Sequence, residues 1–332
     1  MDQNKYIACV AASSGGHIIP TLTLAQDFLA RNPDHKILLF STSKDLDKKI
    51  IDQYSCISRY EFLNFNKQPG IFNKINFLTS FFPNFWQSLK ILKKTKPSEI
   101  ICTGGYICIP VGVAAWLLKI PVNIFELNAI PGKTNKLLSY FASDIYIIFE
   151  NASKSFRSLN CKLVEYPVRF NSKNIIEQKE AILGLNLDPA KKTVLILGGS
   201  QGSIFLNQLI KKIFDQNLYN DFQIIHQTGK NDCAQMQEFF DSKNIKSIVF
   251  DYHHDLSKYY CAADLIICRA GAGTLFEIKF FNKKAAVIPL ETNKNDHQLY
   301  NALAMQNAHS QNFKCIRQHE AFEKLNEILE NL

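Results

Sequence analysis

The chain has 332 residues, of which 46% are hydrophobic and 20% charged, and its formal net charge is +8. This length and balance predict two globular domains and exclude an intrinsically disordered chain. The start of the chain lacks the pattern of a signal peptide, and no apolar stretch is long enough to predict a membrane-spanning helix. The nine cysteines lack CxxC or metal-type spacing, which favours a reducing cytosolic setting. The positive charge predicts an anionic partner, which can be a phosphate, a lipid or a nucleic acid.

The first half of the chain alternates short apolar runs with segments of helix length. Such alternation is typical of the α/β class with a parallel, doubly wound sheet. The predicted strands are residues 6–11, 36–41, 99–103, 121–126 and 144–149.

A loop of small residues, Ala12-Ser13-Ser14-Gly15-Gly16, follows the first predicted strand and ends at His17. A side chain at this place can reach a crevice at the carboxyl ends of the strands. His17 can be a packing residue at the start of the next helix or a functional residue, and the flanking glycines favour function.

Residues 62–98 contain no Asp or Glu but hold six lysines and eight aromatic residues. Ile71, Ile75, Leu78 and Phe82 fall at helical spacing, and we expect Pro83 to interrupt that helix. An apolar face rimmed by lysines suits an anionic bilayer surface, where each lysine contributes about 1 kcal/mol. Core packing and nucleic-acid binding are the competing interpretations. The predicted membrane-docking residues are Ile75, Leu78, Phe82, Phe85, Trp86 and Trp116.

Two further loops, residues 103–106 and 126–135, also follow predicted strands. Both should lie at the same end of the sheet as His17. Glu126 and Asn128 can bind ligand hydroxyls there, although two ordinary turns would show the same pattern.

The pattern changes near residues 166–169, where we place a domain boundary, and a second α/β pattern begins at 192–197. A glycine-rich turn and an amphipathic helix follow, repeating the architecture of residues 6–29. The chain therefore reads as two similar doubly wound domains. The helix carries Leu206, Leu209, Ile210 and Ile213 on one face, and further strands are predicted at 222–227, 247–251, 264–268 and 285–289.

The last of these small-residue loops, residues 269–274, joins a buried apolar strand to a predicted helix with Glu277 in its first turn. A strand, a small-residue loop and a helix N-terminus together can bind an anion such as a diphosphate. An ordinary tight turn between strand and helix would have the same sequence.

Seven segments along the chain, in the order of the family, resemble the MurG-type glycosyltransferases. That family transfers N-acetylglucosamine from its UDP derivative to undecaprenyl-diphosphate-linked muramyl pentapeptide, which converts lipid I to lipid II in peptidoglycan synthesis. The segments are SGGHIIP (14–20), GGYICIPVGVAAWLLKIPVNIFELNAIPGKTNKLLS (104–139), YPVR (166–169), LGGSQGSIFLNQ (197–208), HQTG (226–229), CRAGAGTLFEI (268–278) and DHQLYNA (296–302).

The resemblance implies a GT-B architecture, in which two Rossmann-like domains face a cleft. It implies an acceptor- and membrane-binding domain at 1–165, a UDP-sugar-binding domain at 166–315, and a C-terminal helix at 316–332 packing back toward the first domain. It also implies a peripheral protein on the cytoplasmic face of the bacterial inner membrane. The implied partners are UDP-N-acetylglucosamine, the lipid-linked acceptor and an anionic membrane surface, with other cell-wall synthesis proteins allowed and nucleic acid not expected.

The resemblance assigns roles to particular residues of this chain. Glu277 matches the residue that binds the donor ribose, Gln298 and Asn301 match residues that hold the sugar hydroxyls, and His17 faces the acceptor. Arg169 is the implied cationic partner of the donor diphosphate. The implied catalytic residues are His17, Glu277 and Gln298, and the implied substrate-binding residues are Ser14, Gly15, Gly16, Asn128, Arg169, Ser200, Gln201, Leu256, Ala272, Thr274 and Asn301.

The expected reaction is an inverting transfer with no metal or other cofactor, in which His17 is the candidate base. The DxD triplet at residues 45–47 lies at a predicted helix start, where acidic residues favour the helix dipole, so we expect no metal there. Departures from the family pattern occur at residues 12–14, at Phe125 and at Leu127. The changes at 12–14 leave open a non-catalytic protein that binds a nucleotide sugar or a phospholipid. A related glycosyltransferase with another lipid acceptor is the second alternative, and the match over residues 104–139 argues against it.

Overall fold

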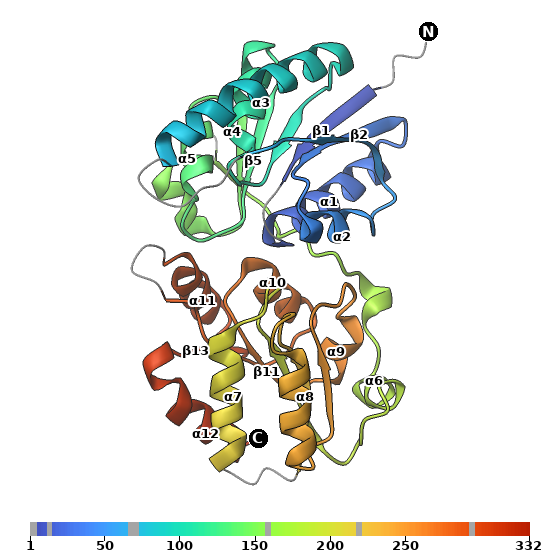
Figure 1. Cartoon of the computed structure of the whole chain (residues 1–332), viewed down its shortest axis with the longest axis vertical. Helices are drawn as coiled ribbons and strands as arrows, with labels where there is room; N and C mark the ends of the chain where they lie inside the picture. Colours follow the sequence, from blue (N-terminus) through green and yellow to red (C-terminus); the bar gives the residue numbers. More distant parts are fainter. Residues whose placement is uncertain (1–4, 12–14, 66–72, 157–160, 217–220, 292–295) are drawn as a thin grey trace. The chain divides into compact units, whose positions relative to one another are not determined.

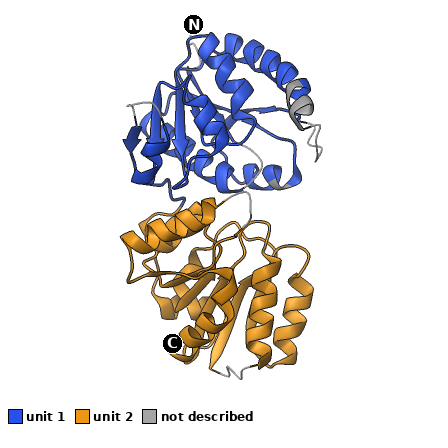
Figure 2. Ribbon diagram, turned by 90° about the vertical axis from the view of Figure 1, so that its left-hand side faces the viewer, with its two compact units in different colours: residues 1–169 blue, residues 170–332 orange. Residues whose placement is uncertain are grey.

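The computed structural model describes residues 5–11, 15–65, 73–156, 161–216, 221–291 and 296–332, without the side chains of Leu46 and of residues 73–78. The chain divides into two compact units, residues 1–169 and 170–332 (Figure 2). The division falls at the end of the segment 166–169. All nine cysteines lie within the described ranges, and none is in a disulfide.

The first unit is built on a parallel sheet with strand order β3-β2-β1-β4-β5-β6-β7. Its inner strands are apolar runs buried on both faces, which is what a parallel sheet covered by helices requires. The strands are β1 Lys5–Val10, β2 His35–Ser41, β3 Ile57–Phe62, β4 Ile100–Cys102, β5 Val122–Glu126, β6 Asp144–Ile147 and β7 Cys161–Leu163.

Helices cover both faces of this sheet, as Figure 1 shows for α3, α4 and α5 on one side and α1 on the other. The α3–α5 side is packed around Leu92, Val111 and Leu138, and α1 buries Leu22 and Ala25. The helices are α1 Gly15–Arg31, α2 Asp45–Ile51, α3 Asn73–Thr95, α4 Cys108–Leu117 and α5 Lys133–Leu138, with a 3-10 turn, η1, at Glu150–Ser155.

Pro83 does not interrupt its helix, so that prediction was wrong. The helix α3 runs continuously from Asn73 to Thr95 with the proline inside it. Proline removes one helical hydrogen bond, and the side chain of the neighbouring Asn84 adds two hydrogen bonds to backbone carbonyl groups. Its Nδ2 donates to the carbonyl oxygens of Ser80 and Asn64, each at 2.8 Å, which ties the helix to the segment after β3.

The second unit has a parallel sheet with strand order β10-β9-β8-β11-β12-β13. All of the strands predicted in either half are present, with ends that differ by two residues at most. The strands are β8 Lys192–Leu197, β9 Phe222–Gln227, β10 Ser247–Phe250, β11 Leu265–Cys268, β12 Ala285–Val287 and β13 Phe313–Cys315.

Helices α7, α8 and α12 share one face of the second sheet, where α7 and α8 lie side by side (Figure 1). The predicted apolar face of α7 is confirmed, because all four of its residues are buried in this core. The helices are α6 Gln178–Gly184, α7 Ile204–Gln216, α8 Cys233–Ser242, α9 Ser257–Ala262, α10 Ala272–Phe280, α11 His297–Ala308 and α12 Ala321–Glu330, with 3-10 turns η2 Ser172–Asn174 and η3 Gln318–Glu320.

The C-terminal helix α12 is amphipathic and belongs to the core of the second unit. Leu325 and Leu329 are buried there together with residues of α7 and β11. The expectation that the terminal segment also packs toward the first domain stays a prediction.

Candidate active site

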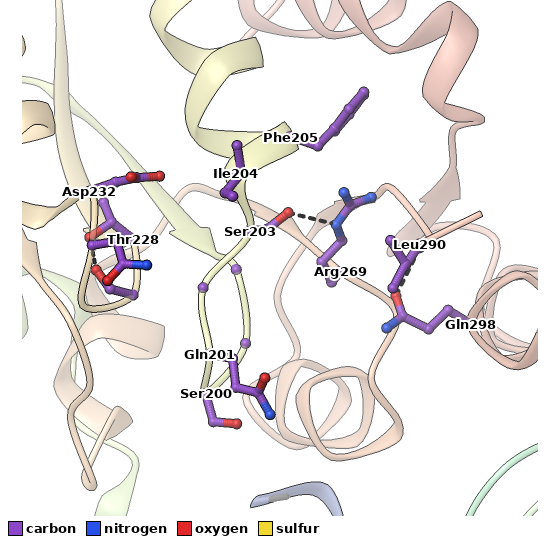
Figure 3. Close-up of a pocket in the computed structure, with 15 residues that line it drawn as sticks. Ser200, Gln201, Ser203, Ile204, Phe205, Thr228, Asp232, Arg269, Leu290 and Gln298 are labelled. Atoms are coloured by element: carbon purple, nitrogen blue, oxygen red, sulfur yellow. Dashed lines mark hydrogen bonds between the residues drawn. The ribbon is translucent and has the colours of Figure 1, made fainter. Parts of the chain in front are cut away.

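Each sheet reverses its strand order once, and ligands of open α/β sheets bind outside the carboxyl ends of the strands at that point. In the second sheet the reversal lies between β8 and β11. The loop after β8 and the loop after β11 border a cavity of about 610 Å³ there (Figure 3). The cavity is lined by Gly198, Gly199, Ser200, Gln201, Gly202, Ser203, Ile204, Phe205, Thr228, Gly229, Asn231, Asp232, Arg269, Leu290 and Gln298.

The glycine-rich loop after β8 needs glycine for two different reasons. Gly199 and Gly202 have φ values of 86° and 75°, a region that side chains other than glycine rarely adopt. A Cβ on Gly202 would also lie 2.0 Å from the carbonyl oxygen of Thr228, whereas one on Gly199 would meet nothing within 4 Å. The loop therefore lies backbone to backbone against the loop after β9, which fixes its shape before any ligand binds.

This loop leads directly into α7, so Ser200 and Gln201 lie just before a helix N-terminus that borders the cavity. The first N–H groups of a helix have no partner inside the helix, and the helix dipole is positive at this end. The arrangement suits a diphosphate, because it offers N–H donors and a favourable potential without a side-chain charge.

The loop after β11 leads into α10, which begins at Ala272 with Gly271 as the residue before it. Glu277 is therefore in the second turn, and the prediction that it lies in the first turn was wrong. Its side chain is 7% exposed, and its Oε2 accepts a hydrogen bond of 2.8 Å from the hydroxyl of Tyr260 in α9. Leu256, immediately before α9, is also buried.

Glu277, Leu256, Ala272 and Thr274 do not line the cavity of Figure 3. They lie along α9 and α10, whereas the glycine loop opens beside α7. The predicted donor residues thus fall into two groups on neighbouring loops. Ser200, Gln201 and Gln298 line the cavity, whereas Leu256, Ala272, Thr274 and Glu277 lie along α9 and α10 outside it.

Gln298 and Asn301 come from α11 and both bind the loop after β11. Gln298 Oε1 accepts the backbone N–H groups of Ala270 at 3.2 Å and of Leu290 at 2.9 Å. Asn301 is 1% exposed, and its Nδ2 donates to the carbonyl oxygen of Ala270 at 3.3 Å. The side-chain oxygen of Gln298 is therefore used within the protein, so this residue can meet a ligand only as an N–H donor.

Arg269 is a cavity residue to which the sequence analysis gave no role. It is the first residue after β11 and is 7% exposed, so the polypeptide holds a guanidinium group inside the site. Its position was visible in the sequence as a charge directly after an apolar strand, but its burial was not. Arg169, which the resemblance named as the diphosphate partner, is not among the cavity residues.

In the first unit the strand order reverses between β1 and β4, and His17 lies at this place in the first turn of α1. Gly15 and Gly16 are the first two residues of that helix and not loop residues, which corrects the expectation, while Ser14 is outside the described residues. His17 Nδ1 lies 3.0 Å from the carbonyl oxygen of Thr103 and donates to it. In the neutral ring the lone pair is then on Nε2.

Gly104 leaves room for the imidazole, since a Cβ there would lie 2.9 Å from His17 Cε1. Thr21 and Thr103 complete the support, with hydroxyl oxygens 2.6 Å apart and both donors within reach of the carbonyl oxygen of His17. The ring is thus held by the loop after β4, whereas the hydroxyl groups of Thr21 and Thr103 hold the backbone of His17.

Glu126 organises the loop after β5 and is not exposed to a ligand, which corrects its predicted role. It is 1% exposed, and burial raises the pKa of its carboxyl group. Its two oxygens accept from the backbone and side-chain nitrogens of Asn128, from the backbone of Gly132 and from Asn135 Nδ2, at 2.8 to 3.2 Å. Asn128 is therefore positioned by a buried carboxyl group.

The predicted membrane-docking residues lie on α3 and α4 of the first unit. Phe82, Trp86 and Trp116 are 56%, 56% and 51% exposed. Phe85 is half-buried and packs against the core, while the side chains of Ile75 and Leu78 lie outside the described part of the chain.

The described residues contain no group of three or more His, Cys, Asp or Glu side chains that could hold a metal ion. In the DxD triplet, Asp47 is 1% exposed and accepts a hydrogen bond from the hydroxyl of Thr42. Within the described ranges no helix is both long and apolar enough to cross a membrane.

Comparisons with known proteins agree with this architecture. Residues 7–147 match the N-terminal domain of glycosyltransferase family 28, and residues 193–332 match its C-terminal domain. Together with the two doubly wound units, these matches define a glycosyltransferase of the GT-B class. The crystal structure of Acinetobacter baumannii MurG has the same fold, with a TM-score of 0.72 and 24% identity over 98% of this chain and 90% of that one.

One relative, from Myxococcus xanthus, is 30% identical over 91% of this chain and 78% of its own length. Another, from Caldanaerobacter subterraneus, is 34% identical over 87% of this chain and 80% of its own length. Both are named UDP-N-acetylglucosamine–N-acetylmuramyl-(pentapeptide) pyrophosphoryl-undecaprenol N-acetylglucosamine transferase. The chain belongs to this family, the MurG glycosyltransferases, as its sequence motifs predicted.

Proposed function

We propose that this protein transfers N-acetylglucosamine from UDP-N-acetylglucosamine to the 4-hydroxyl of undecaprenyl-diphosphate-linked N-acetylmuramyl pentapeptide, with inversion at the anomeric carbon. Membership of the family supports the choice of donor and acceptor. The structural observation that carries the proposal is the cavity between the glycine-rich loop, the N-terminus of α7 and Gln298, because it offers N–H donors to a diphosphate and to a sugar.

In this reaction the acceptor oxygen bonds to the anomeric carbon while the bond from that carbon to the diphosphate oxygen breaks. The electron pair of the broken bond stays on UDP, so the site must stabilise negative charge. The glycine-rich loop and the start of α7 supply that stabilisation electrostatically. Ser200 and Gln201 would hold the diphosphate, Gln298 and Asn301 the sugar, and Glu277 the ribose.

His17 is the proposed base. Its Nδ1 donates to the carbonyl oxygen of Thr103, which leaves the lone pair of Nε2 to take the proton of the acceptor hydroxyl. His17→Ala should keep the affinity for UDP-N-acetylglucosamine and lose most of kcat. The exposed His319 offers a matched control, and turnover of His17→Ala equal to that of His319→Ala would remove His17 as the base.

The decisive experiment measures UDP release from the purified protein with UDP-N-acetylglucosamine and a short-chain lipid I analogue. Release that depends on the acceptor, with a product carrying one added N-acetylglucosamine, is the expected result. Binding of the donor without acceptor-dependent release would favour the non-catalytic alternative. Release only with a different lipid acceptor would favour a related transferase.

We further propose that the protein docks on the cytoplasmic face of the bacterial inner membrane through α3 and α4. Phe82, Trp86, Lys90 and Lys93 follow one another at helical spacing along one side of α3, and all four are exposed. An aromatic stripe that continues into lysines combines apolar insertion with attraction to anionic lipids.

Vesicle co-sedimentation tests this docking surface. Replacing Phe82, Trp86 and Trp116 by Ser should abolish binding to vesicles containing anionic lipid, whereas Leu183→Ser, which removes a 54% exposed residue of the second unit, should not. Equal binding by the triple variant and the native protein would contradict the proposal.

A further inference from the structure

The buried guanidinium group of Arg269 has neutral partners only. Its Nε donates to the hydroxyl of Ser203 at 2.9 Å. Its Nη1 lies 3.1, 3.0 and 2.9 Å from the carbonyl oxygens of Ile288 and Pro289 and from the side-chain oxygen of Gln318. These contacts fix the plane of the guanidinium group against three separate segments of the second unit.

No carboxylate of the described residues forms an ion pair with Arg269. The carboxylate of Glu291 raises the pKa of Arg269, but its Oε2 is already 2.6 Å from Nη2 of Arg317. A buried cation without a counter-ion is costly, because protein dipoles replace only part of its lost hydration. Burial lowers the pKa of Arg269 to about 10, so the group is still charged at neutral pH.

The second terminal nitrogen, Nη2, is the part of the charged group that can contact a ligand. No hydrogen bond within the described residues uses its two N–H groups, yet it is not among the buried atoms that lack a partner. Because Arg269 lines the cavity, Nη2 is the part of the group that remains accessible. Figure 3 shows Arg269 beside the glycine-rich loop, on the same side as Gln298 and opposite Thr228 and Asp232.

One wall of the cavity makes this charge more effective. The ring of Phe205 lies 4.9 Å from the guanidinium carbon of Arg269 and shields one side of it. Ile204 and Leu290 add apolar surface to the same cavity. A cation beside apolar side chains acts through a lower local dielectric, which strengthens its attraction for an anion.

We propose that Arg269 is a cation that binds the diphosphate of the nucleotide-sugar donor. The two N–H groups of Nη2 lie in the plane of a fixed guanidinium group, so they can donate to phosphate oxygens in set directions, whereas an ammonium group carries its donors on a flexible stem. The leaving diphosphate would supply the missing counter-ion and would in turn be stabilised as charge develops on it. This inference rests on the proposed function, because it assumes a nucleoside diphosphate in the cavity.

Titrations with UDP and with uridine test the inference, since the two ligands share the nucleoside and differ in the diphosphate. In Arg269→Met the ratio of UDP affinity to uridine affinity should fall about tenfold or more, the usual effect of losing a charged hydrogen bond. Uridine affinity should stay within about twofold of the native value, because uridine has no phosphate. Arg31→Gln is the matched control: it replaces an exposed arginine of the first unit that does not line the cavity, and its ratio should be unchanged.

If Arg269→Met keeps the native ratio of UDP affinity to uridine affinity, the inference is overturned. An equal loss of affinity for UDP and for uridine in a folded variant would also overturn it, because such a loss indicates a purely structural role. If Arg269→Met does not fold, Arg269→Lys decides. It keeps the charge but cannot hold Ser203 and also present two coplanar N–H groups, so we expect a ratio reduced at least about threefold; an unchanged ratio overturns the inference. Failure of the native protein to bind UDP would instead contradict the proposed function.

Discussion

His226 on β9 is predicted to make the second unit sensitive to acid. Its side chain is fully buried, and neither ring nitrogen has a hydrogen-bond partner. It lies beside Ile196 and Val249 on the neighbouring strands, with its ring 6.1 Å from that of Phe240. Burial lowers the pKa of His226 from 6.5 to about 3, because the charged ring would lose its hydration with nothing in return.

The sign and size of the effect follow from the two pKa values. Above pH 6.5 the ring is neutral in both states, so it does not affect the pH dependence of the free energy of unfolding. Below pH 6.5 the unfolded chain takes up a proton that the folded chain refuses, and stability falls by about 1.4 kcal/mol per pH unit until pH approaches 3. Between pH 7.5 and pH 5 the expected loss from His226 is about 2 kcal/mol.

The assay is urea unfolding at pH 7.5 and at pH 5 for the native protein and for His226→Leu. Circular dichroism reports the transition, and hydrogen exchange of the β9 amides assigns it to the second unit. The fall in stability between the two pH values should be about 2 kcal/mol smaller in the variant, since leucine cannot titrate. His319→Leu, at an exposed site, should fall as much as the native protein. Equal falls in His226→Leu and native protein would refute the reasoning.

Three further predictions concern the site. Gly202→Ala should weaken UDP binding about tenfold or more, measured by calorimetry, because its Cβ would lie 2.0 Å from the carbonyl oxygen of Thr228. A Cβ on Gly199 meets no atom within 4 Å, so Gly199→Ala should cost only about 1–2 kcal/mol of backbone strain. Equal losses of UDP affinity in the two variants would contradict the close backbone packing of the glycine-rich loop. Gln298→Glu keeps the oxygen that accepts two backbone N–H groups but loses the amide donors, so KM for the donor should rise about tenfold at an unchanged melting temperature; an unchanged KM would exclude donation by this residue. Glu126→Gln should lower the free energy of unfolding by about 1–3 kcal/mol in urea titrations, because one oxygen cannot satisfy all the donors of its loop, and native stability would show that the loop is held otherwise.

The sequence was sufficient where the physics is local. Inner strands of a parallel sheet are buried on both faces, so each appears as a continuous apolar run, and the predicted strands are all present. The three strands that the sequence analysis missed are all at sheet edges: β3, β7 and β13. An edge strand has one exposed side, and β3 accordingly carries Arg59 and Glu61 among its apolar residues. The glycine-rich loops after β4 and β8 were recognisable for the same local reason, because their glycines adopt positive φ values that other residues rarely accept.

Tertiary structure decided what the side chains of those loops do. Arg269 and Glu126 are both charged residues at strand ends, and their sequences give no sign that both are buried. The buried carboxyl group of Glu126 accepts hydrogen bonds from its own loop, whereas the buried guanidinium group of Arg269 keeps one accessible nitrogen in the cavity. The reason is that the free energy of a charge depends on which distant segments remove its water and which donors or acceptors replace it. Those segments come together only when the sheet has formed.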